Sequence, residues 1–136
     1  MKQFEFLEHT ADIKFRAYGK SLDELFENCV LAFSEYISRG EGIKSKTKKE
    51  IKLEGQDNES LLSKFLDELI YLIDADGFVT ARAKVKIVGK KLSAILYGDI
   101  VKNYNDLDQV KAATYAEMYI KKKKDKTWEC QVVLDV

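Results

Sequence analysis

The chain has 136 residues, of which 46% are hydrophobic, so it has the length of one ordinary domain and enough apolar material for a core. The 23 basic and 23 acidic residues cancel, which excludes a global cationic field that would attract nucleic acid from a distance. Charges are scattered through the N-terminal residues, and no stretch approaches the roughly 20 apolar residues of a membrane span, which excludes a secretory signal and a transmembrane helix. We therefore expect one soluble domain, residues 1–136, in the cytoplasm.

The first third of the chain predicts two short strands and a helix. Apolar and polar residues alternate around Phe4 and Phe6 and again over residues 13–17, which is the period of half-buried strands. Ser21 and Glu24 have the spacing of a capping box, so a helix should begin there. Its apolar residues recur at spacings of three and four and must pack against a sheet: Leu22, Leu25, Phe26, Cys29, Phe33, Tyr36 and Ile37.

The middle of the chain predicts a strand and a second helix. Ile51 and Leu53 alternate with charged residues before Gly55, and Asp57 or Asn58 can cap the helix that follows. Its apolar face ends near Gly77 and comprises Leu61, Leu62, Phe65, Leu66, Leu69, Ile70 and Ile73.

Two hairpins complete the pattern. Alternating residues lead into and out of the turn at 89–91, and a second pair of strands flanks residues 121–127, with Thr114, Ala116, Met118 and Ile120 expected on one face. Two helices and about seven strands indicate an α+β fold with a largely antiparallel sheet. The order strand, helix, strand, helix also suggests an internal duplication, although no residue-level repeat is visible.

Several familiar sites are missing. The seven glycines are scattered at turns and form no nucleotide-binding loop, and a single histidine gives little basis for a catalytic triad. Cys29 and Cys130 are far apart in sequence and have no nearby Cys or His, which excludes a zinc ribbon or a redox CxxC pair. We expect both cysteines to be core residues of a reduced protein.

Carboxylates near the two ends of the chain are the strongest candidates for chemistry. Asp12 lies at the start of the second predicted strand, and Asp135 is followed only by Val136. If the last strand lies beside the second, their oxygens converge at one edge of the sheet, where a hard cation such as Mg²⁺ or Ca²⁺ would be suited. The alternative is that both aspartates are independent surface charges.

Three further features are ambiguous. His9 is either a hydrogen-bonded structural residue or a ligand or base, and Lys111 is either a functional cation or a solvated surface lysine. The basic run Lys121–Lys126, like the weaker cluster Lys44–Lys49, could contact RNA phosphates. On a hairpin tip, the first cluster could equally protect a sheet edge and keep it soluble.

Four segments in order resemble the archease family: His9–Ile13, Arg16–Gly19, Val110–Met118 and Val133–Val136. The resemblance covers essentially the whole chain. It implies two helices packed on a six-stranded, mainly antiparallel sheet built from intertwined strand-helix-strand units. It also implies a divalent-metal site, for Ca²⁺ or Mg²⁺/Mn²⁺, formed by Asp12, Asp135 and Val136, with His9 beside it and Lys111 at a functionally important position.

The function that this resemblance implies is that of a protein cofactor rather than an enzyme. The partner is the GTP-dependent tRNA-splicing RNA ligase, whose guanylylation and multiple turnover the cofactor promotes, so that contact with RNA is indirect or weak. An alternative is a chaperone that keeps a tRNA methyltransferase from aggregating. A metal-dependent hydrolase that uses the same carboxylates is a third reading, which lacks a general base other than His9.

Overall fold

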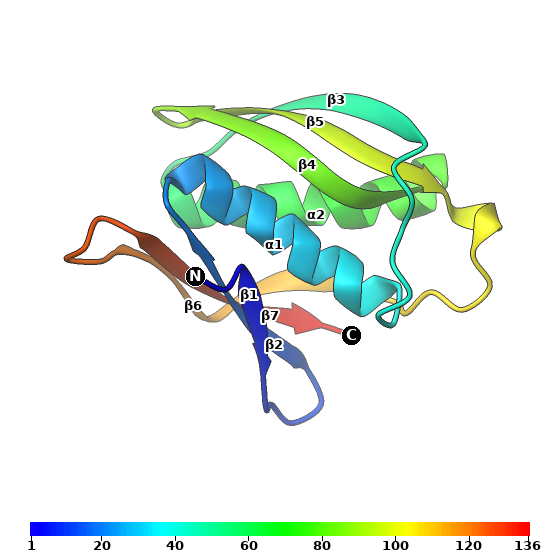
Figure 1. The fold of residues 1–136 in the computed structure, drawn as a ribbon, viewed down its shortest axis with the longest axis horizontal. Coiled ribbons are helices and arrows are strands. Elements are labelled where there is room, and N and C mark those ends of the chain that lie inside the picture. Colours follow the sequence, from blue (N-terminus) through cyan, green and yellow to red (C-terminus); the bar gives the residue numbers. More distant parts are fainter.

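Two helices lie between two antiparallel sheets in the computed structural model, which describes residues 1–136 (Figure 1). The lower sheet has the order β1 (Phe4–Leu7), β2 (Ile13–Gly19), β7 (Trp128–Asp135) and β6 (Ala112–Lys122). The upper sheet has the order β3 (Thr47–Glu54), β5 (Lys91–Ile100) and β4 (Phe78–Val88). The helices are α1 (Leu22–Ile37) and α2 (Asn58–Asp76), and a short 3₁₀ helix spans Val101–Asn103.

The predicted α+β class, with two helices and about seven mainly antiparallel strands, is confirmed. The single six-stranded sheet that the resemblance implied is instead two sheets, of four and three strands. The reason is the width of the apolar surface on the helices. Helix α1 packs against β2 of the lower sheet and β4 of the upper sheet, and α2 packs against β6, β4 and β3. A single sheet would leave one side of each helix in water.

The predicted helix starts are also confirmed. The Ser21 hydroxyl accepts a hydrogen bond from the Glu24 N–H at 3.1 Å, and Asp57 and Ser60 form a capping box at the start of α2. The Glu24 carboxylate accepts from the N–H of Lys20 rather than from that of Ser21, so this capping box is shifted by one residue from the expected pattern. Neither helix combines the length and the apolar character that crossing a bilayer would require.

The structure contains the expected duplication at the level of topology. One unit is β2, α1, β6 and β7, and the other is β3, α2, β4 and β5, inserted between α1 and β6 of the first. In each unit the last strand lies between the other two, which gives the sheet orders β2-β7-β6 and β3-β5-β4. Gly19 precedes its helix cap Ser21 by the same two positions that separate Gly55 from its cap Asp57, so the strand-to-helix turns also correspond.

Each helix protects a strand edge of the other unit. Asp23 and Glu27 of α1 accept hydrogen bonds from the β4 main-chain N–H groups of Ile87 and Val85, at 2.9 and 2.8 Å. The Asp67 carboxylate of α2 accepts from a β6 N–H at 3.1 Å in the same way. These contacts satisfy edge donors that could otherwise pair with another chain, and they intertwine the two units.

The core lies between the two sheets and contains both helices. Phe26 of α1 and Phe65 of α2 stack with ring centroids 5.9 Å apart, which joins the helices at the centre. Cys29 and Cys130 are fully buried, as expected, but the fold also brings their Sγ atoms to 3.4 Å of each other. Burial and the neighbouring thiol raise the pKa of Cys29 well above its ordinary value, so the thiolate form is disfavoured.

Candidate functional site

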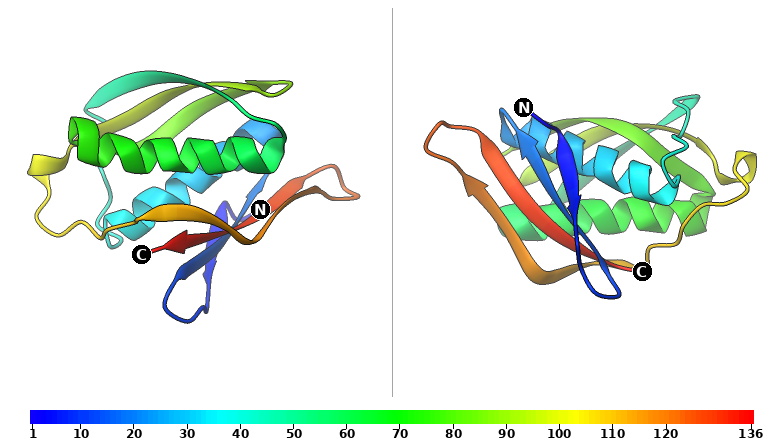
Figure 2. Two further views of the ribbon diagram at one scale, coloured as in Figure 1. Left: turned by 180° about the vertical axis from the view of Figure 1, so that it is seen from behind. Right: turned by 60° about the horizontal axis from the view of Figure 1, so that its bottom comes forward.

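The two ends of the chain meet at one corner of the lower sheet. Ile13 of β2 is directly opposite Leu134 of the antiparallel strand β7, so Asp12 and Asp135 lie one step further along the same pair of strands. The last strand therefore lies beside the second, which is the condition under which the Asp12 and Asp135 oxygens converge. The right-hand view of Figure 2 shows the C-terminal end of β7 beside the turn between β1 and β2.

Lys111 lies at this corner as well. Its main-chain N–H donates a hydrogen bond to the main-chain oxygen of Asp135 at 2.8 Å, and its side chain is exposed. The next residue, Ala112, pairs with Asp135 at the start of β6. We use the term carboxylate corner for Asp12, Lys111, Asp135 and Val136.

The aspartates of the carboxylate corner have few partners. Ile13 and Leu134 face the core, so strand alternation directs the Asp135 side chain to the outer face of the sheet. Neither the Asp12 nor the Asp135 carboxylate accepts a hydrogen bond from the protein, and the Asp12 side chain is 36% exposed. The His9 Nδ1 atom lies 3.9 Å from the Asp12 Oδ2, beyond hydrogen-bond distance. Both carboxylates are therefore accessible to an external cation or to a partner.

His9 is held in a defined orientation by Glu117 of β6. The two side chains are joined at 2.9 Å between His9 Nε2 and Glu117 Oε2, and Lys14 donates to the other carboxylate oxygen at 3.1 Å. The His9 Nδ1 atom is buried, has no hydrogen-bond partner and lies on the side of Asp12. His9 is thus hydrogen-bonded, as the structural reading expected, and one of its nitrogens is still unpaired beside the carboxylate corner.

Glu117 is the site residue that sequence reasoning missed. It has a positive φ of 55° at an irregularity in β6, where the pairing with β7 shifts register between Thr114 and Tyr119. The Gln131 side chain donates to its main-chain oxygen at 2.8 Å and supports this conformation. Hydrogen bonds from His9 and Lys14 lower the pKa of Glu117, so its carboxylate is favoured in the ionised form.

The same irregularity corrects the predicted face of β6. The expected alternation over Thr114, Ala116, Met118 and Ile120 holds only in its second half, where Met118 and Ile120 pack against the core. Before the irregularity the buried residue is Ala113, and Ala116 is exposed. The shift in register changes which side chains face inward, and no residue in the strand, such as a glycine, signals it in advance.

The lysine-rich hairpin lies away from the carboxylate corner, at the opposite end of β6 and β7 (Figure 1). Lys121 and Lys123 each lie 3.6 Å from a carboxylate oxygen of Glu129. Burial opposes ionisation of Glu129, but hydrogen bonding from Tyr119 and the charges of the two lysines lower its pKa overall. Part of the positive charge of Lys121–Lys126 is therefore neutralised within the hairpin.

Comparison with known proteins agrees with the family resemblance of the sequence segments that form this corner. Residues 4–136 match the Archease protein family. The chain belongs to the archease family. It is 41% identical to the protein archease of Pyrococcus furiosus over the full length of both chains, and 39% identical to that of Methanosarcina barkeri over 99% of this chain and 97% of the relative.

A solved archease structure has the same fold. The solution structure of Methanobacterium thermoautotrophicum protein 1598 superposes with a TM-score of 0.84 at 34% identity, and the match covers both chains completely. The family resemblance inferred from the four sequence segments is therefore confirmed over the whole length of this archease.

Proposed function

We propose that this archease is a non-enzymatic protein cofactor that promotes guanylylation and multiple turnover of the GTP-dependent tRNA-splicing RNA ligase. Membership in the archease family supports this proposal. The observation that carries it is the pairing of Ile13 with Leu134, because this pairing gathers Asp12, Asp135 and the Lys111 main chain into one accessible corner. The corner presents charged groups from several elements at the surface and has no enclosed substrate cavity of its own. This arrangement is suited to contact with a partner protein.

Asp12, Asp135 and the main-chain oxygen of Val136 would hold a divalent cation. Carboxylate and carbonyl oxygens suit Ca²⁺, Mg²⁺ or Mn²⁺, and the lack of hydrogen-bond donors to either carboxylate favours a cation as their partner. No group of three or more His, Cys, Asp or Glu side chains is arranged to hold a metal by itself, so main-chain oxygen or water would have to complete the coordination. When bound at the ligase, such a cation would neutralise charge on the phosphates of GTP.

The surrounding residues would orient the carboxylate corner. If His9 donates its Nε2–H to Glu117, its Nδ1 carries a lone pair that faces the Asp12 side. A lone pair at this position attracts a cation and repels other oxygen or nitrogen lone pairs. Lys14 holds the other oxygen of Glu117 and fixes the carboxylate between two partners. The exposed Lys111 side chain would contact a phosphate or a carboxylate of the ligase.

The test is a turnover assay with purified ligase, GTP and broken tRNA halves, with the archease at a small fraction of the ligase concentration. We expect many ligations per ligase molecule when this protein is present and few when it is absent. Unchanged turnover would refute the proposal. Nucleotide hydrolysis by this protein alone would instead support the metal-dependent hydrolase.

The chaperone reading requires a different surface. A chaperone would depend on a contiguous exposed apolar patch, whereas the large exposed apolar side chains apart from Met1 come from five different elements: Phe6, Tyr71, Val88, Ile100 and Tyr115. Light scattering of a methyltransferase with and without this protein separates the two functions. Suppressed aggregation that survives substitution of both aspartates, with no effect on the ligase, would favour the chaperone.

A further inference from the structure

The β3-β5-β4 sheet has an uncovered side that is separate from the carboxylate corner. Leu92, Ala94 and Leu96 of β5 are buried against the helices, so strand alternation directs Ser93, Ile95 and Tyr97 to the opposite side. No other element covers this side of the sheet, which forms the upper surface of the molecule in Figure 1. We use the term outer face for this surface.

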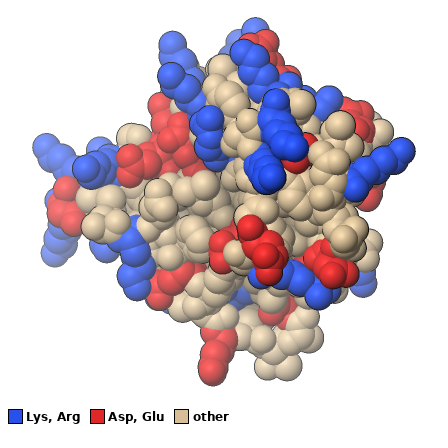
Figure 3. All heavy atoms as spheres, turned by 45° about the vertical axis from the view of Figure 1, so that its right-hand side comes forward, with Lys and Arg blue, Asp and Glu red and all other residues tan.

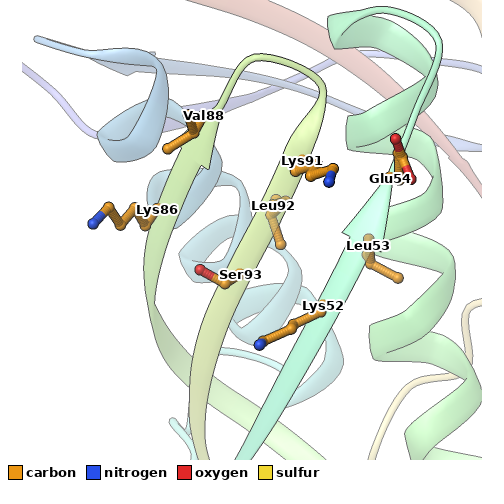
Figure 4. A pocket seen from close by; sticks show the side chains of 8 residues that line it. All are labelled: Lys52, Leu53, Glu54, Lys86, Val88, Lys91, Leu92 and Ser93. Carbon is orange, nitrogen blue, oxygen red and sulfur yellow. The ribbon is translucent and has the colours of Figure 1, made fainter.

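Strand register aligns the side chains of the outer face in rows across the three strands. Lys52, Ser93 and Lys86 form one row, which Figure 4 shows side by side. The other rows, each given in the order β3, β5, β4, are Lys48, Tyr97, Arg82; Glu50, Ile95, Lys84; and Glu54, Lys91, Val88. Every row therefore contains at least one basic side chain, and the two outer strands place most of these charges on either side of β5.

The charge of this surface differs from that of the whole chain. Six basic residues and two acidic residues occupy the outer face, although the complete chain has a formal net charge of zero. All six basic side chains are exposed and none forms an ion pair: Lys48, Lys52, Arg82, Lys84, Lys86 and Lys91. Figure 3 shows basic side chains gathered along this upper side of the molecule. The outer face is therefore a local cationic surface with no partner inside the protein.

The surface is also hollowed along its length. Two adjoining shallow grooves follow the strands, one lined by Lys52, Lys86 and Lys91, and the other continuing past Lys84 toward Ile95. Charged and polar residues make up just over half of the lining of each groove, and the stems of the long lysine side chains and apolar residues contribute most of its surface. An open groove with basic margins is suited to an extended polyanion.

Arg82 and Tyr97 indicate which polyanion fits. The guanidinium carbon of Arg82 lies over the Tyr97 ring, 4.0 Å from its centre. This pair is one row beyond the row of Ile95, at which the grooves end. Nucleobases stack on guanidinium and aromatic planes. The carboxylates of an acidic peptide and the phosphate of a lipid headgroup have no planar ring that could stack in this way. Val88 is the only exposed large apolar side chain of the outer face, which is less than membrane insertion requires.

We propose that the outer face binds single-stranded RNA, with phosphates along the lysine rows and a base stacked on the Arg82–Tyr97 pair. This inference goes beyond the proposed ligase activation and does not depend on it, because it concerns binding of RNA by this protein alone. It also places the RNA contact on a different surface from the lysine-rich hairpin, where two of the lysines are already paired with Glu129.

The test is fluorescence anisotropy of a labelled short single-stranded RNA at several salt concentrations. The combined substitution Lys52→Glu and Lys86→Glu should raise the dissociation constant about tenfold or more. It should also reduce the dependence of log affinity on log salt by about 1.4, since each lost phosphate contact on a single strand contributes about 0.7. The matched control Lys124→Glu with Lys122→Glu changes the net charge equally on the hairpin and should retain most of the affinity.

Variants of Tyr97 provide a second, independent test of the stacking part of the proposal. Tyr97→Phe retains the ring and should bind RNA like the wild type, whereas Tyr97→Leu should weaken binding of the single strand more than binding of an RNA duplex; thermal melting verifies that both variants fold. Equal losses of RNA affinity in the outer-face variant (Lys52→Glu with Lys86→Glu) and in the hairpin variant (Lys124→Glu with Lys122→Glu) would overturn the proposal. Unchanged RNA affinity in both variants would overturn it as well. Wild-type binding of phosphatidylserine vesicles or poly-glutamate as tight as binding of RNA would also overturn it.

Discussion

Ile13 and Leu134 face each other across β2 and β7, although 121 positions separate them in the chain, and this pairing creates the carboxylate corner. Both side chains pack against the core, so the corner is anchored by apolar burial on one side of the sheet while its charged groups lie on the other. The position of Asp12 relative to Asp135 thus depends on strand pairing and not on any contact between the two aspartates.

Replacing both aspartates should remove cation binding without unfolding the protein. Asp12→Asn and Asp135→Asn retain the side-chain volume but lose the charges that favour a divalent cation, so affinity for Ca²⁺ or Mn²⁺ should fall at least about tenfold. The melting temperature in the absence of the cation should change little, since neither carboxylate accepts a hydrogen bond from the protein. Isothermal titration calorimetry measures the affinity, with Asp106→Asn, an exposed loop acid, as the control; equal affinities in all variants would contradict the metal site.

Lys111 should act only through its side chain. The hydrogen bond to Asp135 comes from the main chain of Lys111, so Lys111→Met should keep the fold and the cation affinity. Stimulation of the ligase should nevertheless fall by about tenfold or more if the side chain contacts phosphate or a carboxylate. Lys111→Arg, which preserves the charge, should recover part of the stimulation, and full activity of the Met variant would refute a role for this lysine.

Glu117 should make the stability of the protein sensitive to acid. Its pKa in the folded state is lowered from the ordinary value of 4.5, first by the hydrogen bond with His9 and then by Lys14. The stabilisation from its carboxylate is therefore fully present above the ordinary Glu pKa and is lost as the pH falls through the lower folded-state pKa. Thermal melts of wild type and Glu117→Gln should differ most at neutral pH and converge in acid; a constant difference would show that Glu117 contributes no charge-dependent stability.

The two strand-to-helix turns should respond alike to a single methyl group. A Cβ atom would lie 2.5 Å from the Leu25 main-chain nitrogen at Gly19 and 2.9 Å from that of Leu61 at Gly55. Backbone atoms cannot yield to such a clash as a flexible side chain does, so Gly19→Ala and Gly55→Ala should each lower the free energy of unfolding by about 1–3 kcal/mol. Urea denaturation measures both, and Gln56→Ala provides a neighbouring control that should have little effect.

The buried cysteines should be unreactive in the folded protein. Burial and the proximity of Cys130 raise the pKa of Cys29, and neither thiol is accessible to solvent. Alkylation by iodoacetamide should therefore proceed no faster than unfolding, whereas both thiols should react rapidly in denaturant. Mass spectrometry counts the modified thiols, and fast labelling of the native protein would mean that the packing between α1 and β7 opens readily.

Local patterns in the sequence were sufficient to predict where the helices begin and which face of a regular strand is buried. Ser21 and Asp57 begin the two helices because each cap side chain accepts a hydrogen bond from a main-chain N–H only three residues later. The alternation around Leu92, Ala94 and Leu96 identifies the buried face of β5 for a similar reason, since neighbouring side chains point to opposite sides of a strand. The irregular stretch of β6 escaped this reasoning, because a register shift depends on the partner strand as well as on the strand itself.

The amino-acid pattern was enough to predict the two amphipathic helices, the hairpins, the candidate residues at both chain ends and the family to which the chain belongs. Three features became visible only in the three-dimensional fold: the strands divide into two sheets with the helices between them, Glu117 is hydrogen-bonded to His9, and six lysine and arginine side chains share one face. Capping and amphipathic periodicity arise from residues a few positions apart. Sheet partition and side-chain clusters arise instead from how distant segments bury their apolar faces together.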